Sequence, residues 1–188
     1  MRGPTKTLPN VQSLRCKECG RDYPLDPIYV CDFCFGPLEV AYDYDTAAKN
    51  MSRESIQDGP PTIWRYDQLL PASRENAVDI GAGMTPLLKA DNLGKELGLN
   101  NLWIKNDAAN PTHSFKDRVV SVAATKALEF EFDTIACAST GNLAGATAAH
   151  GAKAGLKTIV FLPADVERGK ILGAAVFGSV VLVNGNYD

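Results

Sequence analysis

Four of the five cysteines occur as two closely spaced pairs near the start of the chain, and few small folds accommodate this pattern. Two residues separate Cys16 from Cys19, two separate Cys31 from Cys34, and eleven lie between the pairs. A C-x-x-C turn presents two thiolates to one ion, and two such turns complete a tetrahedral site of the zinc-ribbon type. The interval is shorter than the usual range of about 15–20 residues. The spacing predicts a zinc ion bound by all four thiolates, with disulfides or a redox-active pair as the alternatives.

The predicted zinc ion is structural rather than catalytic. Four protein ligands fill its coordination sphere, and a segment of about 40 residues buries too little apolar surface to fold without such a cross-link. Gly20 and Gly36 follow the two pairs, where we expect a left-handed backbone at each turn exit, and residues 23–30 are expected to supply strands. The fifth cysteine, Cys137, lies in an apolar run and is expected to be a buried core residue.

Composition and charge argue against several classes of partner. The chain has 188 residues, is 45% hydrophobic and carries 19 basic and 22 acidic residues, with no basic block. A general electrostatic attraction to nucleic acid is therefore not expected. No apolar run reaches the roughly 18 residues that a membrane span needs, and residues 1–10 lack the apolar core of a signal peptide. We expect a globular cytoplasmic protein with no nucleic-acid or membrane partner.

A connector is expected after the cysteine segment. Three prolines interrupt residues 42–79, and only short helical fragments, such as residues 63–70, fit between them. Trp64 and Tyr66 are expected to pack this connector against the body of the protein.

From Met84 onward, strand-like and helix-like segments alternate. The predicted strands are residues 101–106, 134–138, 158–163 and 180–185, and the predicted helices are residues 114–130, 142–155 and 166–178. The apolar stripe of the first helix comprises Phe115, Val119, Val122, Ala123 and Leu128. This alternation is typical of an α/β fold with a parallel sheet and right-handed crossovers. Ligands bind where the loops leave the strands. These loops are residues 106–114, 139–142, 163–167 and 184–188.

Lys116 lies where the first of these loops enters a helix. Thr112 or Ser114 can serve as the N-cap, and Asp117, three residues after Ser114, resembles the second member of a capping box. The positive end of the helix dipole disfavours an ammonium ion there. The position therefore suggests a neutral amine, used for a Schiff base with an aldehyde cofactor or for proton transfer. A solvated surface lysine is the alternative.

Residues 139–142 form a second candidate binding loop, between a strand and a helix. The turn leaves several backbone N–H groups free beside the hydroxyls of Ser139 and Thr140, which predicts a binding site for a carboxylate or phosphate. The amide of Asn142 either donates a hydrogen bond into the same cleft or caps the helix. The alternative is a capped turn with no ligand.

Longer stretches of the chain resemble a known family. Residues 110–118, 136–155 and 160–171, preceded by residues 83–98 and the cysteine segment, are similar to the threonine synthases of the pyridoxal-phosphate fold type II superfamily. The resemblance implies an N-terminal zinc ribbon followed by part of a three-layer α/β sandwich with a parallel sheet. The implied parts are the ribbon in residues 1–45, the connector in residues 46–83, part of the large cofactor domain in residues 84–130 and part of a small mobile domain in residues 131–188.

The resemblance also implies roles for individual residues. Lys116 would bind the cofactor, pyridoxal 5'-phosphate, covalently and act as the catalytic base. Asn142 would hydrogen-bond the phenolic oxygen of the cofactor. Ser139, Thr140 and the backbone of Asn142 would bind the substrate carboxylate. The implied reaction converts O-phosphohomoserine and water to threonine and phosphate, in an enzyme expected to be a homodimer.

The chain departs from the family pattern in two ways. The family's commonest residue at position 113 is glycine, whereas this chain has His113, which is expected either to contact a phosphate group or to fill the loop. The other histidine, His150, is expected to be structural, as are Asp117 and Arg118. Family members are longer, and their glycine-rich phosphate loop lies beyond the part that corresponds to residues 1–188. We therefore expect an N-terminal part that binds the cofactor weakly through Lys116 and does not turn over substrate alone.

Two other functions stay open at this point. A cysteine synthase or a threonine dehydratase-like enzyme of the same superfamily would use Lys116 on a different substrate. A non-catalytic zinc-ribbon adaptor or truncated fragment would bind a partner through the cysteine segment and leave Lys116 unused. The acidic balance and the candidate binding loops favour an enzyme.

Overall fold

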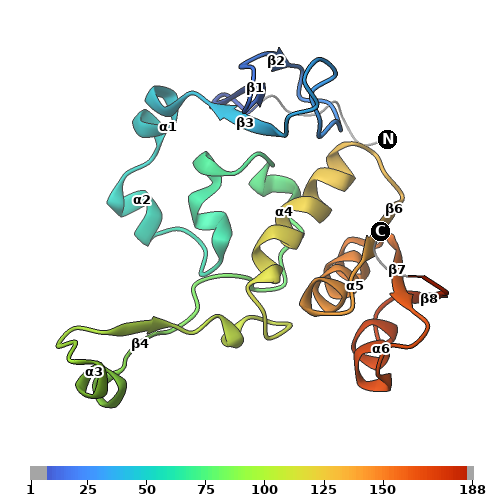
Figure 1. Cartoon of the computed structure of the whole chain (residues 1–188). Helices are drawn as coiled ribbons and strands as arrows, with labels where there is room; N and C mark the ends of the chain where they lie inside the picture. The colour runs from blue at the N-terminus through green and yellow to red at the C-terminus, as the bar shows by residue number, and fades with distance from the viewer. Residues whose placement is uncertain (1–7, 186–188) are drawn as a thin grey trace.

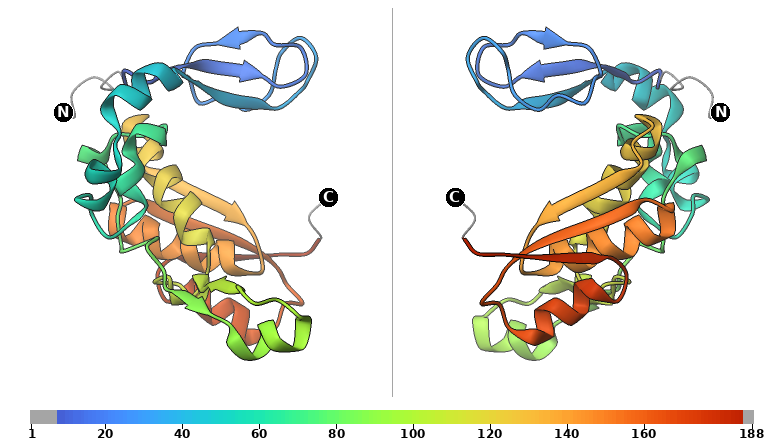
Figure 2. Two further views of the ribbon diagram at one scale, coloured as in Figure 1. Left: turned by 90° about the vertical axis from the view of Figure 1, so that its left-hand side faces the viewer. Right: turned by 90° about the vertical axis from the view of Figure 1, so that its right-hand side faces the viewer.

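A computed structural model describes residues 8–185 of the chain. An antiparallel ribbon lies at one end of the molecule and a two-stranded arm at the other, with helices and a parallel sheet between them (Figures 1 and 2). The ribbon consists of β1 (Val11–Cys16), β2 (Asp22–Tyr23) and β3 (Leu38–Tyr42), and the connector of α1 (Tyr44–Asn50), α2 (Arg53–Gln57), η1 (Ile63–Leu69) and η2 (Arg74–Asn76). The arm consists of β4 (Leu87–Lys89), α3 (Asp91–Leu97) and β5 (Trp103–Lys105). The remaining elements are η3 (Asp107–Ala109), α4 (Lys116–Glu129), β6 (Thr134–Ala138), α5 (Asn142–Ala154), β7 (Lys157–Pro163), α6 (Arg168–Ala175) and β8 (Ser179–Val183). The last three residues of the predicted loop 184–188 lie outside the described residues.

The ribbon is an antiparallel sheet with the strand order β2-β1-β3. Its main pairing joins β1 to β3, with Cys16 opposite Leu38. The prediction that residues 23–30 supply the strands is therefore largely wrong, because only Tyr23 and an isolated bridge from Val30 take part. The interval contains two prolines, which lack the N–H that a strand donates to its neighbour.

The backbone of the two cysteine turns agrees with the sequence in one case and differs in the other. Gly20 has a left-handed conformation (φ 75°), as predicted. At the second turn the left-handed residue is Phe35 (φ 59°), so the prediction for Gly36 is wrong. Gly36 is required for a different reason, since a Cβ atom there would lie 2.7 Å from Glu18 Cγ and 3.0 Å from Cys16 Sγ.

Trp64 fixes the connector to the body of the protein, as predicted. Its side chain is 1% exposed and packs with Ile63 and Ala72. The indole Nε1 donates a hydrogen bond to Ser121 Oγ on α4 (3.0 Å). Tyr66, by contrast, is 44% exposed, so the same prediction is wrong for Tyr66.

Two further buried hydrogen bonds join the connector to α4. Ser121 Oγ donates to the carbonyl of Val78 (2.6 Å), and the N–H of Val78 donates to Thr125 Oγ1 (2.9 Å). Because Ser121 and Thr125 are fully buried, each hydroxyl satisfies a backbone group that water does not reach.

The change Trp64→Phe is expected to lower the free energy of unfolding by about 2–3 kcal/mol, because it removes the bond to Ser121 and leaves a cavity. Urea unfolding monitored by circular dichroism measures this difference. The matched control is Tyr66→Phe, which removes a hydroxyl from an exposed ring and should change the free energy by less than about 0.5 kcal/mol. Equal effects of the two variants would contradict the anchoring role of Trp64.

The arm differs from the sequence prediction. Residues 101–106 were expected to join the parallel sheet, but β5 instead pairs antiparallel with β4, with Leu88 opposite Ile104. All six residues of the two strands are exposed. Neither strand is covered by another element, and neither pairs with the parallel sheet.

The parallel sheet has the strand order β6-β7-β8, which confirms the predicted α/β class. Because the order is sequential, right-handed crossovers place α5 and α6 on the same face. Figure 2 shows the sheet with these helices beside it. The core of this part consists of Ala144, Val160, Leu162 and Ala174. Cys137 packs against this core and is half-buried, in line with its predicted structural role.

Helix α5 lies unusually close to the sheet at Gly151. A Cβ atom at this position would lie 2.0 Å from Thr158 Oγ1 and 3.1 Å from Ile135 Cγ2. A Cβ atom therefore does not fit unless the side chain of Thr158 turns away or the helix and the sheet move apart.

Helix α4 packs beside α5 through a face that the apolar stripe did not predict (Figure 1). Phe115 and Val119, both in the predicted stripe, are 56% and 54% exposed. The buried residues are Asp117, Val120, Ser121, Ala124, Thr125 and Ala127. Small or hydrogen-bonded side chains fill this face because α5 and the connector approach it closely and supply partners for its polar groups.

In the part of the chain that the structure describes, no helix has both the length and the apolar character needed to cross a bilayer.

Candidate functional site

The four predicted zinc ligands lie together in the ribbon. Their sulfur atoms all lie within 4.8 Å of one another. Cys16 Sγ is 3.4 Å from Cys34 Sγ, and Cys19 Sγ is 3.7 Å from Cys31 Sγ. A tetrahedral zinc ion with Zn–S bonds of about 2.3 Å places its ligands about 3.8 Å apart. The cluster therefore fits zinc, and all four cysteines are free thiols in this arrangement rather than disulfides.

Hydrogen bonds favour a thiolate at Cys31. Burial alone would raise the pKa of this thiol, but a bond from the Tyr23 hydroxyl (3.0 Å) and the N–H groups of Cys34 and Phe33 lower the pKa to about 6. The pKa of Tyr23 is raised by its hydrogen bonds to Asp32 and Cys31, so Tyr23 stays a donor. Sequence reasoning missed Tyr23. An aromatic residue with a hydroxyl between the cysteine pairs was the available signal.

The loop before α4 is held by Asn110, which is 2% exposed. Its Oδ1 accepts a hydrogen bond from the N–H of Gly83 (3.0 Å), and its Nδ2 donates to the carbonyl of Asp107 (3.0 Å). These bonds fix the path of the chain just before Lys116.

Lys116 lies in the first turn of α4, as predicted, although the helix begins at Lys116 rather than at residue 114 and its N-cap is Phe115 rather than Thr112 or Ser114. The predicted capping box is wrong. Ser114 Oγ accepts from the N–H of Lys116 itself (3.1 Å). The carboxylate of Asp117 bonds to Thr112 rather than to Ser114. A second interaction, with a partner far away in sequence, draws this carboxylate inward.

That second partner is His150 on α5. Asp117 Oδ1 accepts from Thr112 Oγ1 (2.8 Å) and from His150 Nε2 (3.2 Å), and Oδ2 accepts from the N–H of Thr112 (2.8 Å). Both Asp117 and His150 are fully buried. Their contact is the one hydrogen bond that the described residues make between α4 and α5, and it supports the predicted structural role of both.

The pKa of His150 is lowered from its ordinary value of 6.5, because burial disfavours the charged ring more than the opposing groups favour it. These groups are Asp117, whose charge and hydrogen bond raise the pKa, the nearby carbonyl of Val78, and Asp79. The folded protein thus keeps His150 neutral at a pH where the unfolded chain takes up a proton.

The free energy of unfolding is therefore expected to fall as the pH drops below about 6.5, with a slope of up to about 1.4 kcal/mol per pH unit from this group. Urea unfolding between pH 5 and pH 8 measures the slope, and the control is His150→Gln, which has no titrating ring. The variant should lack this part of the slope. Identical slopes in the two proteins would show that His150 does not titrate differently on folding.

Arg118 and Asp107 join α4 to the end of the arm. Arg118 Nη2 lies 2.8 Å from Asp107 Oδ1, and Thr85 Oγ1 donates to the same carboxylate (2.6 Å). The hydrogen bond from Arg118, followed by that from Thr85, lowers the pKa of Asp107 to about 2. The contacts of Arg118 are structural, as predicted.

The second candidate loop has the predicted free backbone groups. Gly141 is the N-cap of α5 and offers no side-chain cap, and its N–H donates to Ser139 Oγ (3.3 Å). Among the described residues, the N–H groups of Thr140, Asn142 and Leu143 meet no acceptor. The Asn142 side chain is exposed, so it is not used as a cap.

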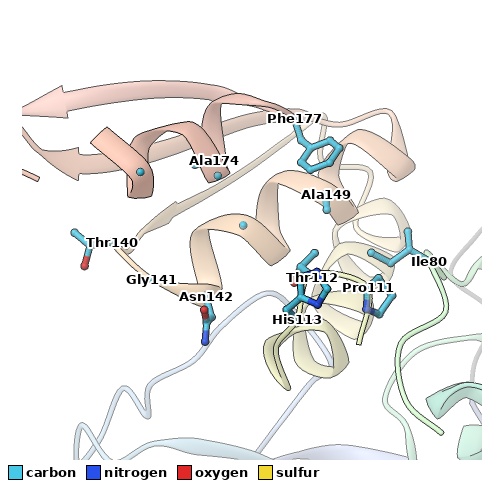
Figure 3. A pocket seen from close by; sticks show the side chains of 13 residues that line it. Ile80, Pro111, Thr112, His113, Thr140, Gly141, Asn142, Ala149, Ala174 and Phe177 are labelled. Atoms are coloured by element: carbon cyan, nitrogen blue, oxygen red, sulfur yellow. The ribbon is translucent and has the colours of Figure 1, made fainter. Parts of the chain in front are cut away.

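A cavity of about 650 Å³ opens beside this loop. It is lined by residues 111–113 from the loop before α4, by residues 140–142, and by α6 with the following Phe177. Figure 3 shows side chains of these segments around α5. The volume lies within the range of about 300–1,000 Å³ that is usual for small-molecule sites. Lys116 and Ser139 are not among the residues that line this cavity, so the structure brings only part of the predicted set to its wall.

His113 lies on the wall of the cavity in a left-handed conformation (φ 58°). This conformation explains why glycine suits the position, since a residue with a Cβ atom pays about 1–2 kcal/mol there. Nδ1 of His113 donates to the carbonyl of Ala108 (3.1 Å), which leaves Nε2 as the ring nitrogen without a hydrogen-bond partner among the described residues.

The chain combines a parallel sheet, a lysine at a helix start and a second helix start with free N–H groups, as in an α/β enzyme that binds a small anionic ligand. Comparison with known families identifies the class. The family model described as "Pyridoxal-phosphate dependent enzyme" matches residues 78–188, more than half of the chain. The chain belongs to this family. A second model, "NinF protein", matches residues 15–39, the cysteine segment.

Within this family, the chain is similar to threonine synthases. The chain is 46% identical over 178 residues to a threonine synthase of Methanosarcina acetivorans, covering 93% of this chain and 43% of the relative. It is 43% identical over 178 residues to a threonine synthase of Methanocaldococcus jannaschii, covering 93% and 44%. The chain thus spans less than half the length of these relatives. Among solved structures, threonine deaminase isoform 2 of Solanum lycopersicum has a TM-score of 0.54 at 25% identity, covering 78% of this chain and 35% of that one.

The individual groups suit the cofactor that gives the family its name, although Lys116 does not line the cavity. Lys116 makes no ion pair among the described residues, and its Nζ lies 4.8 Å from the centroid of the Phe115 ring. No carboxylate therefore competes with an aldehyde for this amine. The amide of Asn142 and the free N–H groups at the start of α5 supply donors suited to an anionic ligand.

Proposed function

We propose that the chain is the part of a threonine synthase that carries the cofactor lysine and the loop for the substrate carboxylate. The observation that carries the proposal is the similarity to threonine synthases at 43–46% identity over 93% of the chain. The similarity to threonine deaminase is weaker, at 25% identity.

We assign Lys116 as the catalytic residue and the covalent attachment point of pyridoxal 5'-phosphate. Asn142 would donate a hydrogen bond to the phenolic oxygen of the cofactor. Ser139, Thr140 and the N–H of Asn142 bind the substrate carboxylate. The free N–H groups of Thr140, Asn142 and Leu143 and the exposed amide of Asn142 support these roles.

The bound cofactor supplies an electron sink for the negative charge that develops at Cα. The amine of Lys116 takes the proton from Cα and moves protons at Cβ, which is general acid–base work suited to a mobile amine. The start of α5 holds the carboxylate still while phosphate leaves Cγ and water adds at Cβ. The overall reaction converts O-phosphohomoserine and water to threonine and phosphate.

The four-cysteine cluster holds zinc in a structural role, because its four ligands leave no open position for a substrate. We place the protein in the cytoplasm, where thiols of this kind stay reduced. We also propose a homodimer, which analytical ultracentrifugation tests directly.

The experiment that tests the proposed function measures products. The chain is extended with the remaining residues of the Methanosarcina acetivorans relative and incubated with pyridoxal phosphate and O-phosphohomoserine. Threonine and inorganic phosphate are expected in equal amounts, and the 188-residue chain alone is expected to release neither.

The same mixtures test the alternatives within the superfamily. O-acetylserine with sulfide yields cysteine if the protein is a cysteine synthase, and threonine yields a 2-oxo acid and ammonia if it is a dehydratase. Either result, without threonine formation from O-phosphohomoserine, would overturn the proposal.

A further inference from the structure

We infer that His150 is a positioning residue, which acts through Asp117 to hold Thr112 and Lys116 in place relative to α5. The inference rests on the proposed function of Lys116. It assigns a role in the site to a buried histidine that touches neither the cavity nor the loop that binds the carboxylate.

The contact joins the two halves of the candidate site. Asp117 directly follows Lys116 on α4, and its carboxylate also holds the backbone and the hydroxyl of Thr112, which lines the cavity. His150 lies on α5, about two helical turns after Asn142. One hydrogen bond of 3.2 Å between His150 Nε2 and Asp117 Oδ1 therefore relates the lysine end of the site to the anion-binding end.

Stability alone does not explain a histidine at this position. Nδ1 of His150 is fully buried near the carbonyl of Val78, to which it can donate only when the ring is protonated, so in the neutral ring this nitrogen has no hydrogen-bond partner among the described residues. An unpaired buried nitrogen costs free energy that an apolar side chain of similar size avoids. The hydrogen bond from His150 Nε2 to Asp117 offsets this cost. Its effect is to fix the position of α4 relative to α5.

The position of α4 relative to α5 matters for catalysis, since a displacement of a catalytic group by about 1 Å can lower a reaction rate about 100-fold. Asp117 accepts three hydrogen bonds, two of them from Thr112. Loss of the third leaves the carboxylate of Asp117 free to move, which weakens the two hydrogen bonds that it accepts from Thr112.

Three variants of the 188-residue chain separate this role from general stability. His150→Leu removes the donor with a similar volume. His150→Gln keeps an N–H donor near the position of Nε2. Thr147→Val is the matched control, because Thr147 is buried on the same helix and makes no hydrogen bond to α4 among those of the described residues.

The first readout is the fraction of Lys116 modified by a fixed concentration of pyridoxal phosphate, trapped with borohydride and located by peptide mapping. His150→Leu is expected to lower it about 10-fold, whereas His150→Gln restores it and Thr147→Val leaves it unchanged. The second readout is hydrogen exchange of the Thr112 amide, which His150→Leu should speed about 10-fold without affecting β6 and β7.

If the wild-type chain is modified at Lys116, the inference is supported only when His150→Leu both lowers this modification and speeds the exchange of the Thr112 amide. One of these changes without the other overturns the inference. A uniform rise in exchange across α4, α5 and the sheet also overturns it, because that result shows a general loss of stability. If the wild-type chain is not modified at Lys116, the 188 residues alone do not hold the cofactor, and product formation by the extended protein still decides the proposed function. The exchange of Thr112 then decides the inference: a local rise in His150→Leu upholds it, and no change overturns it.

Discussion

Replacing Lys116 by alanine is expected to lower threonine formation by the extended protein about 10²–10⁴-fold, because the variant has no amine to move protons at Cα and Cβ. In the 188-residue chain, Lys116→Ala should also eliminate the selective adduct with pyridoxal phosphate after borohydride reduction. The two measurements are product formation and peptide mapping of the reduced protein.

The control for this experiment is Lys153→Ala. Lys153 lies in the last turn of α5 and is exposed, so its removal should change neither measurement. Adducts spread over several lysines, with no loss on removing Lys116, would contradict the assignment of Lys116.

Removal of zinc is expected to unfold the ribbon while leaving the helices and the parallel sheet folded. Among residues 11–42, the buried apolar side chains are Val11, Cys16 and Cys31, and two of these three are zinc ligands. Structural zinc contributes about 10–16 kcal/mol of binding energy in small domains, which this segment cannot replace by packing. Metal analysis should give one zinc ion per chain, and a chelator should abolish the slow hydrogen exchange of β1 and β3.

Two cysteine variants test the same point. Cys31→Ser removes a ligand and is expected to reproduce the effect of the chelator, whereas Cys137→Ser lies outside the cluster and should retain the zinc. Retention of slow exchange in the chelated protein would contradict a structural role for zinc. Cross-linked thiols in the purified chain would instead support the disulfide alternative.

The sequence predicted the elements of the parallel sheet because each has a local signal. Residues 134–138 coincide with β6, and α5 ends at Ala154, one residue before the predicted end, beside Gly155 with its left-handed backbone (φ 70°). Paired thiols carry a similarly local signal, because the spacing of each C-x-x-C turn fixes both ligands. The four-part division of the chain stays a prediction.

Features that depend on distant partners were not predictable. The pairing of β4 with β5 depends on which strand lies nearby, and no pattern within residues 101–106 indicates this. The buried face of α4 is set by α5 and by Trp64, so the predicted apolar stripe was wrong at Phe115 and Val119, although Val122 does pack against the cluster around Trp64.

The candidate site shows the same division. Lys116 and Asn142 were identified from motifs, and both begin helices as expected. The bond between Asp117 and His150 joins residues 33 positions apart, and only the packing of two helices creates it. The cavity walls supplied by α6 and Phe177 were likewise missed, since glycine and phenylalanine in a helical segment carry no signal of a binding site.

The close approach at Gly151 has a mechanical consequence for the other end of α5. Gly151 and Asn142 belong to one helix of 13 residues, and the helix moves as a rigid rod with a length of about 20 Å. A Cβ atom at position 151 would lie 2.0 Å from Thr158 Oγ1 and 3.1 Å from Ile135 Cγ2, so with the Thr158 side chain held in place the helix would be displaced from the sheet. The resulting tilt would shift Asn142 and the free N–H groups at the start of α5. The absence of a side chain at Gly151 therefore helps to determine the direction in which the N-terminus of α5 points.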